Sequence, residues 1–177
     1  MRLFIALPVK GAARDAIAAY QAELSRAGVR GSFLRPENLN LTLAFMGEQP
    51  GLGEAAAALS SFFAPPAVFF LDGLESFRGG EMLWLVPTED LALRRLRGAM
   101  KLLHRELRIS GISLEERKLQ PHVTLCLHAV LPEGLTPAAL PPPPSIPLEM
   151  EEVILYESHS PGGILTYSPK GSVVLAY

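Results

Sequence analysis

Two segments of this chain alternate between apolar and polar residues. NLNLTLAFM (38–46) interleaves leucines with two asparagines and a threonine, and PHVTLCLHAV (121–130) does so with histidine, threonine and cysteine. Alternation with a period of two is typical of a β-strand that buries one face. We therefore predict two such strands. One face of the second is predicted to carry Gln120, His122, Thr124, Cys126 and His128, and the opposite face Val123, Leu125 and Leu127.

Three other segments place apolar residues at helical spacing. Residues 9–27 and 89–107 have apolar side chains three or four positions apart, and 54–63 is a shorter candidate that ends before Pro65. The second long segment, EDLALRRLRGAMKLLHREL, also carries several arginines and lysines. Those charges, together with His104, are predicted to form a solvent-exposed face.

Short apolar runs bounded by glycine and proline predict further strands. They cover residues 2–7, 68–77, 81–87, 148–157 and 172–177. The segment around Pro36 is expected to lead in extended form into the first alternating strand, and 132–147 is expected to be a proline-rich loop. Strands joined by tight turns, with helices off to one side, indicate an α+β fold with a largely antiparallel sheet.

Composition narrows the class of protein. The 177 residues fit one domain, 1–177, of one or two lobes. A net charge of −2 and a pI of about 6.1 argue against a general nucleic-acid coat that binds through bulk charge. The single cysteine, Cys126, excludes an internal disulfide and indicates a reducing compartment. The apolar N-terminal run is too short for a signal peptide or a membrane span, so we expect a cytoplasmic protein that does not bind membranes.

The two alternating strands carry a recognisable chemistry. Residues two apart on a strand point the same way, roughly 6–7 Å apart, so His122 and Thr124 can touch one tetrahedral anion together. Two such strands facing each other bracket a phosphate between titratable rings and hydroxyl donors. One imidazole then deprotonates water while the other protonates the departing oxygen, with neither metal nor cofactor. The hydroxyl groups stabilise charge on the phosphoryl oxygens.

Four segments resemble the RNA 2′,3′-cyclic phosphodiesterases, also called 2′-5′ RNA ligases, of the two-histidine (2H) phosphoesterase superfamily. They are the opening MRLFIAL, RPENLNLTLAFMGE in place of P-E-N-L-H-L-T-L-x-F-L-G-E, PHVTL for P-H-x-T-L, and the tail VILYESHSPGGILTYSPKGSVVLAY. The resemblance implies an α+β fold with two pseudo-symmetric lobes, whose antiparallel sheets face each other across a central cleft with helices outside. It also implies hydrolysis of a terminal 2′,3′-cyclic phosphate to a 2′-phosphomonoester, with weak 2′-5′ joining of RNA in some members.

Residue roles follow from the resemblance, with three departures. His122 is the implied acid/base group, and Thr42 and Thr124 are the implied phosphate donors. Asn40 stands where the family has its first histidine; its amide can hydrogen-bond a phosphoryl oxygen but cannot transfer a proton. Gln120 and Leu127 stand where the family commonly has basic residues, which is expected to weaken the grip on phosphate or RNA. Three departures around one site favour natural drift over an engineered Asn40.

Further residues are candidates for substrate binding. Tyr156 and Ser158 match the closing turn of the family and are expected to line the cleft, with core packing as the alternative for Tyr156. Phe33 and Trp84 are candidates for stacking on a base, with core packing favoured for Trp84.

The remaining titratable side chains near the second motif have simpler interpretations. His128 and His159 are candidates to compensate for the missing histidine, and the simpler interpretation of each is a surface or packed side chain. Cys126 is expected to be a small filler on the face of His122, because no adjacent base would activate it as a nucleophile.

Two further functions remain open. A catalytically inactive member would use the same cleft to bind RNA ends or cyclic nucleotides. A small interaction module would leave both threonine strands without chemistry, which the matching residues around both motifs disfavour. The partners that we expect are RNA ends or a cyclic nucleotide, with the protein a monomer.

Overall fold

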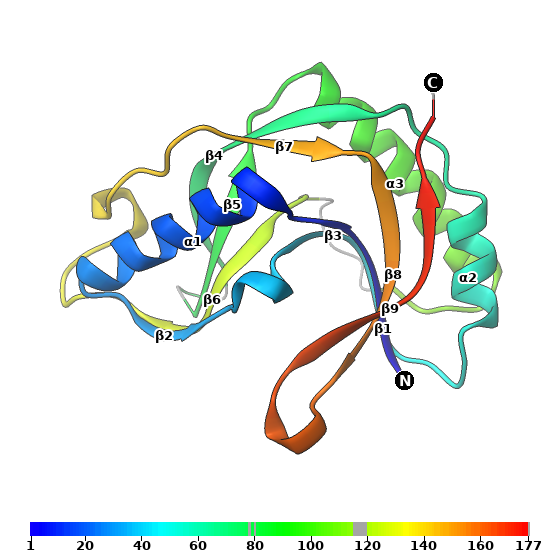
Figure 1. Cartoon of the computed structure of the whole chain (residues 1–177), viewed down its shortest axis with the longest axis horizontal. Helices are drawn as coiled ribbons and strands as arrows, with labels where there is room; N and C mark the ends of the chain where they lie inside the picture. Colours follow the sequence, from blue (N-terminus) through cyan, green and yellow to red (C-terminus); the bar gives the residue numbers. More distant parts are fainter. Residues whose placement is uncertain (78, 80, 115–119, 177) are drawn as a thin grey trace.

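The fold is one continuous, strongly curled sheet of nine strands with three helices around it (Figure 1). It is seen in a computed structural model, which describes residues 1–77, 79, 81–114 and 120–176. The strands are β1 (Arg2–Pro8), β2 (Arg30–Phe33), β3 (Asn40–Glu48), β4 (Ala67–Phe77), β5 (Met82–Pro87), β6 (Val123–Val130), β7 (Ile146–Met150), β8 (Glu152–His159) and β9 (Thr166–Val174), and the helices α1 (Gly11–Arg26), α2 (Gly53–Ser60) and α3 (Leu91–Ile109).

The sheet has two halves that meet in its middle. The strand order is β7-β4-β5-β6-β3-β1-β8-β9, and all pairs are antiparallel. We call β3, β1, β8 and β9 the first half-sheet, and β6, β5, β4 and β7 the second. In each half-sheet two strands are linked through a long helix, β1 and β3 through α1 and then β2 in the first, and β5 and β6 through α3 in the second. The predicted α+β fold with antiparallel strands is confirmed, and the two sheets that the resemblance implied are halves of one continuous sheet.

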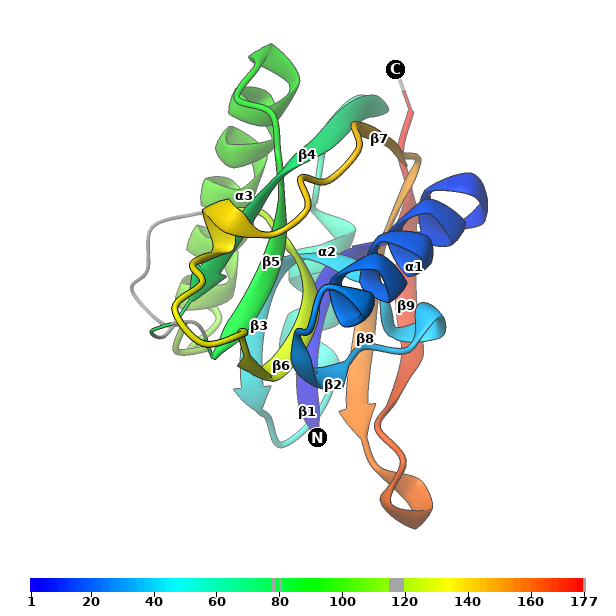
Figure 2. The same cartoon turned by 90° about the vertical axis from the view of Figure 1, so that its left-hand side faces the viewer.

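The halves are joined at one point and separate beyond it. Of the described strand residues, Leu41 and Val123 form the one registered pair between β3 and β6. Farther along β6, the short strand β2 takes the place of β3, with Ser32 opposite Leu127 and Phe33 opposite Cys126. The two motif strands therefore pair next to their motifs and not beyond them, and Figure 2 shows β2 beside the end of β6.

Both long helices contact the half-sheet opposite to the strands that they join, and α3 also contacts a strand of its own half-sheet. α1 joins two strands of the first half-sheet but contacts β7, and α3 joins two strands of the second but contacts β3 as well as β4. α2 packs against β8 and β9. The predicted apolar stripe of α3 is confirmed, since Leu93, Leu96, Met100, Leu103 and Leu107 are all buried. No helix in the part of the chain that the structure describes is both long and apolar enough to cross a bilayer.

Three predicted boundaries are corrected. The predicted strand 148–157 is two strands, β7 and β8, that lie near opposite edges of the sheet and meet at Glu151. The segment before Pro36 includes the short strand β2 instead of being merely extended, and the last strand already begins at Thr166. In the first two cases a pairing partner distant in the sequence decides the boundary, and an apolar run does not reveal that partner; β9 instead extends along its hairpin partner β8.

Candidate active site

The two motifs face one cavity where β3 and β6 meet. With Leu41 opposite Val123 in an antiparallel pair, Thr42 lies across from His122 and Asn40 across from Thr124. Leu41 and Val123 point to the other side, into the core, where both are fully buried. All four motif side chains line a cavity of about 900 Å³. The structure therefore brings together the four residues that the sequence predicts as the centre of the site.

A bulge follows the motif threonine on both strands. On β3, Thr42 pairs with Ala6 but Ala44 pairs with Ile5, so Leu43 is an extra residue in the ladder. On β6, Thr124 pairs with Trp84 and Cys126 with Leu83, so Leu125 is the extra residue. A β-bulge shifts the alternation of side chains by one position. Phe45 and Leu127, three residues past the threonines, consequently line the cavity.

The bulge on β6 corrects the predicted faces of that strand. Cys126, expected on the face of His122, is fully buried in the core, and Leu127, expected on the opposite face, lines the cavity. Burial raises the pKa of the Cys126 thiol to about 11, which agrees with its interpretation as a filler, because the reactive thiolate is scarce near neutral pH.

His122 is oriented by its own backbone neighbourhood and by an aromatic stack. Its Nδ1 lies 2.9 Å from the carbonyl oxygen of Gln120. A carbonyl oxygen only accepts, so Nδ1 carries the hydrogen, and in the neutral ring Nε2 has the lone pair. The imidazole lies flat on the indole of Trp84, with ring centroids 3.7 Å apart and an interplanar angle of 14°. Trp84 in turn stacks on Phe77 at 4.6 Å.

Trp84 is the main residue whose place the sequence did not reveal. The sequence favours core packing for Trp84, whereas the structure puts it in the cavity wall, 8% exposed and in contact with His122. The indole Nε1 is buried without a hydrogen-bond partner among the residues that the structure describes. The hydrophobic run MLWLV gave no signal of this, because the contact depends on which strand pairs with β5.

Asn40 and Thr42 are hydrogen-bonded to each other. Asn40 is 9% exposed, and its Nδ2 donates to the carbonyl oxygen of Asn38 at 3.1 Å. Thr42 Oγ1 donates to Asn40 Oδ1, also at 3.1 Å. The threonine hydroxyl has one hydrogen, so Thr42 must release Asn40 before it can donate to a phosphate. The first motif thus lacks a titratable group and holds its hydroxyl donor in an internal bond.

A guanidinium group from helix α3 contacts Gln120. Arg97 Nη2 donates to Gln120 Oε1 at 3.1 Å, and Arg97 Nη1 donates to Glu89 Oε2 at 2.7 Å. The bond to Glu89 raises the pKa of Arg97. Arg97, predicted to lie on the solvent face of its helix, therefore supplies a guanidinium beside the position where the family carries a basic residue.

Of the other three histidines, His104 and His159 line the cavity and His128 does not. His104 is not on a solvent face as predicted: it lines the cavity, and its Nε2 lies 2.8 Å from the Leu43 carbonyl oxygen. Burial lowers the pKa of His104. His159 also lines the cavity, with Nε2 2.6 Å from the Ser168 hydroxyl.

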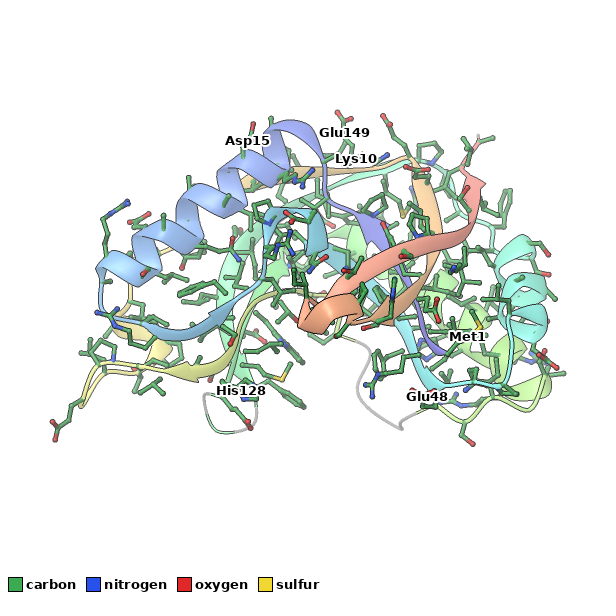
Figure 3. All side chains as sticks on the ribbon, turned by 60° about the horizontal axis from the view of Figure 1, so that its bottom comes forward. Met1, Lys10, Asp15, Glu48, His128 and Glu149 are labelled. Atoms are coloured by element: carbon green, nitrogen blue, oxygen red, sulfur yellow. The ribbon has the colours of Figure 1, made fainter. Side chains whose placement is uncertain are left out.

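His128 lies away from the motif residues. Its φ is positive, at 51°, and its Nδ1 lies 3.5 Å from Glu81 Oε1. The side chain points outward in Figure 3. Its side chain is not among the described cavity-lining residues. The prediction that it shares the face of His122 is wrong, because the bulge after Thr124 changes which residues face the cavity.

Of the predicted substrate-binding residues, Ser158 and Trp84 are among the described residues of the cavity wall, and Tyr156 and Phe33 are not. Tyr156 stacks on Phe4 at 5.2 Å instead, and burial raises its pKa to about 12. Phe33 packs against the core. Lining residues that the sequence did not single out include Arg2, Phe4, Phe45, His104 and Tyr167.

Comparisons with known proteins find similarity over nearly the whole chain. No protein-family model matches the sequence. The RNA 2′,3′-cyclic phosphodiesterase of Geobacillus stearothermophilus is 27% identical over 184 residues, in an alignment that covers 98% of this chain and 56% of that protein. The chain therefore spans little more than half the length of this curated relative.

The solved structures of E. coli LigT are similar over nearly the whole chain. The apo form has a TM-score of 0.81 and 26% identity, and the complex with 3′-AMP has a TM-score of 0.84 and 27% identity. Each comparison covers 99% of this chain and 98% of LigT. Further structures of LigT hold ATP, NADP⁺ and phosphate.

Proposed function

We propose that this chain, which belongs to the RNA 2′,3′-cyclic phosphodiesterase (2H phosphoesterase) family of LigT, hydrolyses a 2′,3′-cyclic phosphate at an RNA end to a 2′-phosphomonoester. The observation that carries the proposal is the arrangement of His122, Thr124, Thr42 and Asn40 around one cavity, with the His122 ring held in a defined tautomer. Weak 2′-5′ RNA joining, in which a 5′-hydroxyl replaces water as the nucleophile and the same bond to the 3′-oxygen breaks, belongs to the same proposal.

His122 acts as the general base in this scheme. Its Nδ1–H is held by the Gln120 carbonyl, so Nε2 accepts a proton from water as the water oxygen attacks phosphorus. The bond between phosphorus and the 3′-oxygen breaks, and the 2′-oxygen keeps the phosphate. The departing 3′-oxygen takes its proton from solvent, because Asn40 cannot supply one. Thr124 donates a hydrogen bond to a phosphoryl oxygen.

The scheme uses side chains alone and needs no bound metal or cofactor. His122 supplies the proton acceptor, and the hydroxyl and amide groups around it supply hydrogen bonds to the phosphate. We further propose that the protein acts as a monomer in the cytoplasm, on RNA ends or cyclic nucleotides. The 3′-AMP and ATP complexes of LigT support nucleotides as the ligand class.

One observation favours a second candidate function. The internal bond between Thr42 and Asn40, in a motif without a titratable ring, suits a cleft that binds RNA ends without turning them over. General acid/base groups typically contribute roughly 10²–10⁴-fold in rate, so the loss of one is severe. The binding function predicts tight association and no product.

Hydrolysis of a short RNA with a 2′,3′-cyclic phosphate end, in the presence of EDTA, tests the proposal and separates the two functions. The parent protein is compared with Asn40→His and His122→Ala. A 2′-phosphate product that disappears in His122→Ala supports catalysis by one histidine. Product from Asn40→His alone means that the scaffold works but lacks one proton-transfer group. No product from parent or Asn40→His would overturn the enzymatic proposal and favour the binding function.

A further inference from the structure

The cavity extends along β3 beyond the motif residues, to an exposed aromatic side chain. Phe45 is 48% exposed and lines the same cavity as Thr42. The bulge at Leu43 is what brings it there, because simple alternation from Thr42 would point Phe45 into the core. At about 3.4 Å per residue, Phe45 lies roughly 10 Å along the strand from Thr42. An exposed phenyl ring in this position offers a flat face to a ligand that already occupies the motif end.

A cation lies over one face of this ring. The guanidinium carbon of Arg2 lies 5.8 Å from the centroid of the Phe45 ring, and Arg2 also lines the cavity. Among the described lining residues, Arg2 is the only arginine or lysine. No salt bridge to Arg2 is found within the described part of the chain. Its charge is therefore available to an anionic ligand.

The backbone under this pair is fixed. β1 runs antiparallel to β3, with Phe4 opposite Phe45 and Arg2 opposite Glu48, and on its other side Arg2 is opposite Ser158. The N-terminal ammonium of Met1 lies 3.2 Å from Glu48 Oε2, and Figure 3 shows both at the same edge of the molecule. Arg2 and Phe45 thus belong to paired strands and not to a loop, so they form a preorganised surface.

We propose that Arg2 and Phe45 form a second nucleotide subsite, which takes the base and phosphate of the nucleotide preceding the cyclic phosphate end. A base stacks on the exposed face of Phe45, and the Arg2 guanidinium pairs with the connecting phosphate. The inference rests on the proposed function and deepens it, because it makes single-stranded RNA of at least two nucleotides the preferred ligand. A mononucleotide fills only the motif end of the cavity.

Equilibrium binding of two product-like ligands tests the subsite without needing turnover. One ligand is 2′-AMP, and the other is the dinucleotide ApA with a 2′-phosphate on its 3′-terminal nucleoside. The parent is expected to bind the dinucleotide at least tenfold more tightly than 2′-AMP, since base–aromatic stacking contributes at this level. Phe45→Ala is expected to reduce that ratio by about tenfold. Phe63→Ala is the matched control, because Phe63 is 79% exposed and does not line the cavity.

Arg2→Gln provides an independent measurement. It is expected to lower the slope of log K against log salt for the dinucleotide by about 0.7, the value for one phosphate contact on a single strand. An unchanged ratio in Phe45→Ala together with an unchanged slope in Arg2→Gln would overturn the subsite. Equal losses for both ligands in Phe45→Ala would also overturn it, because Phe45 would then contact the terminal nucleotide.

The two proposals fail in different ways. Dinucleotide preference that depends on Phe45, without any hydrolysis by the parent or Asn40→His, would support the subsite and overturn the enzymatic function. Hydrolysis with no preference for the dinucleotide would leave the function standing and overturn the subsite. Circular dichroism and thermal unfolding of each variant check that the fold is retained.

Discussion

The two half-sheets have the same strand arrangement at their motifs but different side chains. Each presents a motif strand with a bulge after its threonine, paired to a neighbouring strand. In the second half-sheet the neighbour of Thr124 is Trp84, whose indole supports the His122 ring. In the first, the neighbour of Thr42 is Ala6, which offers no aromatic face, and the motif residue is Asn40. The histidine thus lies where an aromatic neighbour contacts it, and the asparagine lies where the neighbouring strand offers none.

This difference suggests a division of labour between the half-sheets. The second combines an oriented histidine with a threonine that bonds to no described neighbour through its side chain, and is equipped for proton transfer. The first contains a closed Asn40–Thr42 pair and, past its bulge, Phe45 near Arg2. At the matching place past the bulge of the second, Leu127 is apolar. We infer that chemistry is concentrated in one half-sheet and ligand recognition in the other.

Removing each motif side chain in turn is the strongest way to break this comparison. His122→Ala is expected to lower the rate of cyclic-phosphate hydrolysis by about 10²–10⁴-fold, because it removes the general base. Asn40→Ala is expected to lower it by less than about tenfold, since it removes only a hydrogen-bonding amide. Steady-state rates on one RNA substrate provide the measurement. Equal losses in the two variants would contradict the division of labour.

The two threonines are expected to differ in phosphate binding. Thr124→Val should weaken the affinity for 2′-AMP by about 10-fold or more, as for a lost hydrogen bond to a charged group. Thr42→Val should weaken it by less than about threefold, because Thr42 already donates to Asn40 and gains little by exchanging that bond. Isothermal titration calorimetry measures both, and a larger effect at Thr42 would show that its internal bond opens when ligand binds.

The stack beneath His122 can be tested by replacing the indole. Trp84→Leu is expected to reduce kcat by roughly tenfold with a smaller change in KM, because the imidazole loses the surface that fixes its plane. Trp84→Phe keeps a flat ring and serves as the control that should recover much of the rate. A loss confined to KM in Trp84→Leu would place Trp84 in substrate binding instead of positioning.

Adding a charge to the second half-sheet should make the two halves more alike. Leu127→Arg is expected to tighten binding of 2′-AMP by about two- to fivefold, through a solvent-accessible ion pair worth up to about 1 kcal/mol. Val130→Arg, on the same strand but 63% exposed and outside the cavity wall, is the matched control. Equal changes in the two variants would indicate a general effect of net charge.

The smallest effect concerns His104 and the dependence of stability on pH. Burial lowers the pKa of His104 from its ordinary value of 6.5, so the unfolded chain binds this proton at a higher pH than the folded one. The free energy of unfolding should therefore fall as the pH is lowered from 6.5 towards the folded pKa. In His104→Gln this part of the pH dependence should be absent. Urea unfolding of the parent and of His104→Gln at pH 7.5 and 5.5 measures how much the free energy of unfolding changes with pH. An equal change in the two proteins would contradict the prediction.

Much of the fold could be predicted from local patterns. Alternation identified β3 and β6, and the leucine stripe identified α3, because each pattern reflects the pitch of a single element. The motif residues Asn40, Thr42, His122 and Thr124 share a cavity as predicted. Two of the wrong predictions have one cause in common. Cys126 and His128 were placed by simple alternation, and the bulge at Leu125 interrupts it.

The sequence by itself determined which side chains are present at the two motifs, that they lie on strands, and that only one carries an imidazole. Only the tertiary structure decided what surrounds them. Trp84 reaches His122, Phe45 turns into the cavity and Arg2 joins it because of pairing registers and bulges between strands far apart in the chain. Side-chain direction along one strand is a local property, whereas register and cross-strand neighbours depend on the partner strand, which the alternation of one segment does not specify.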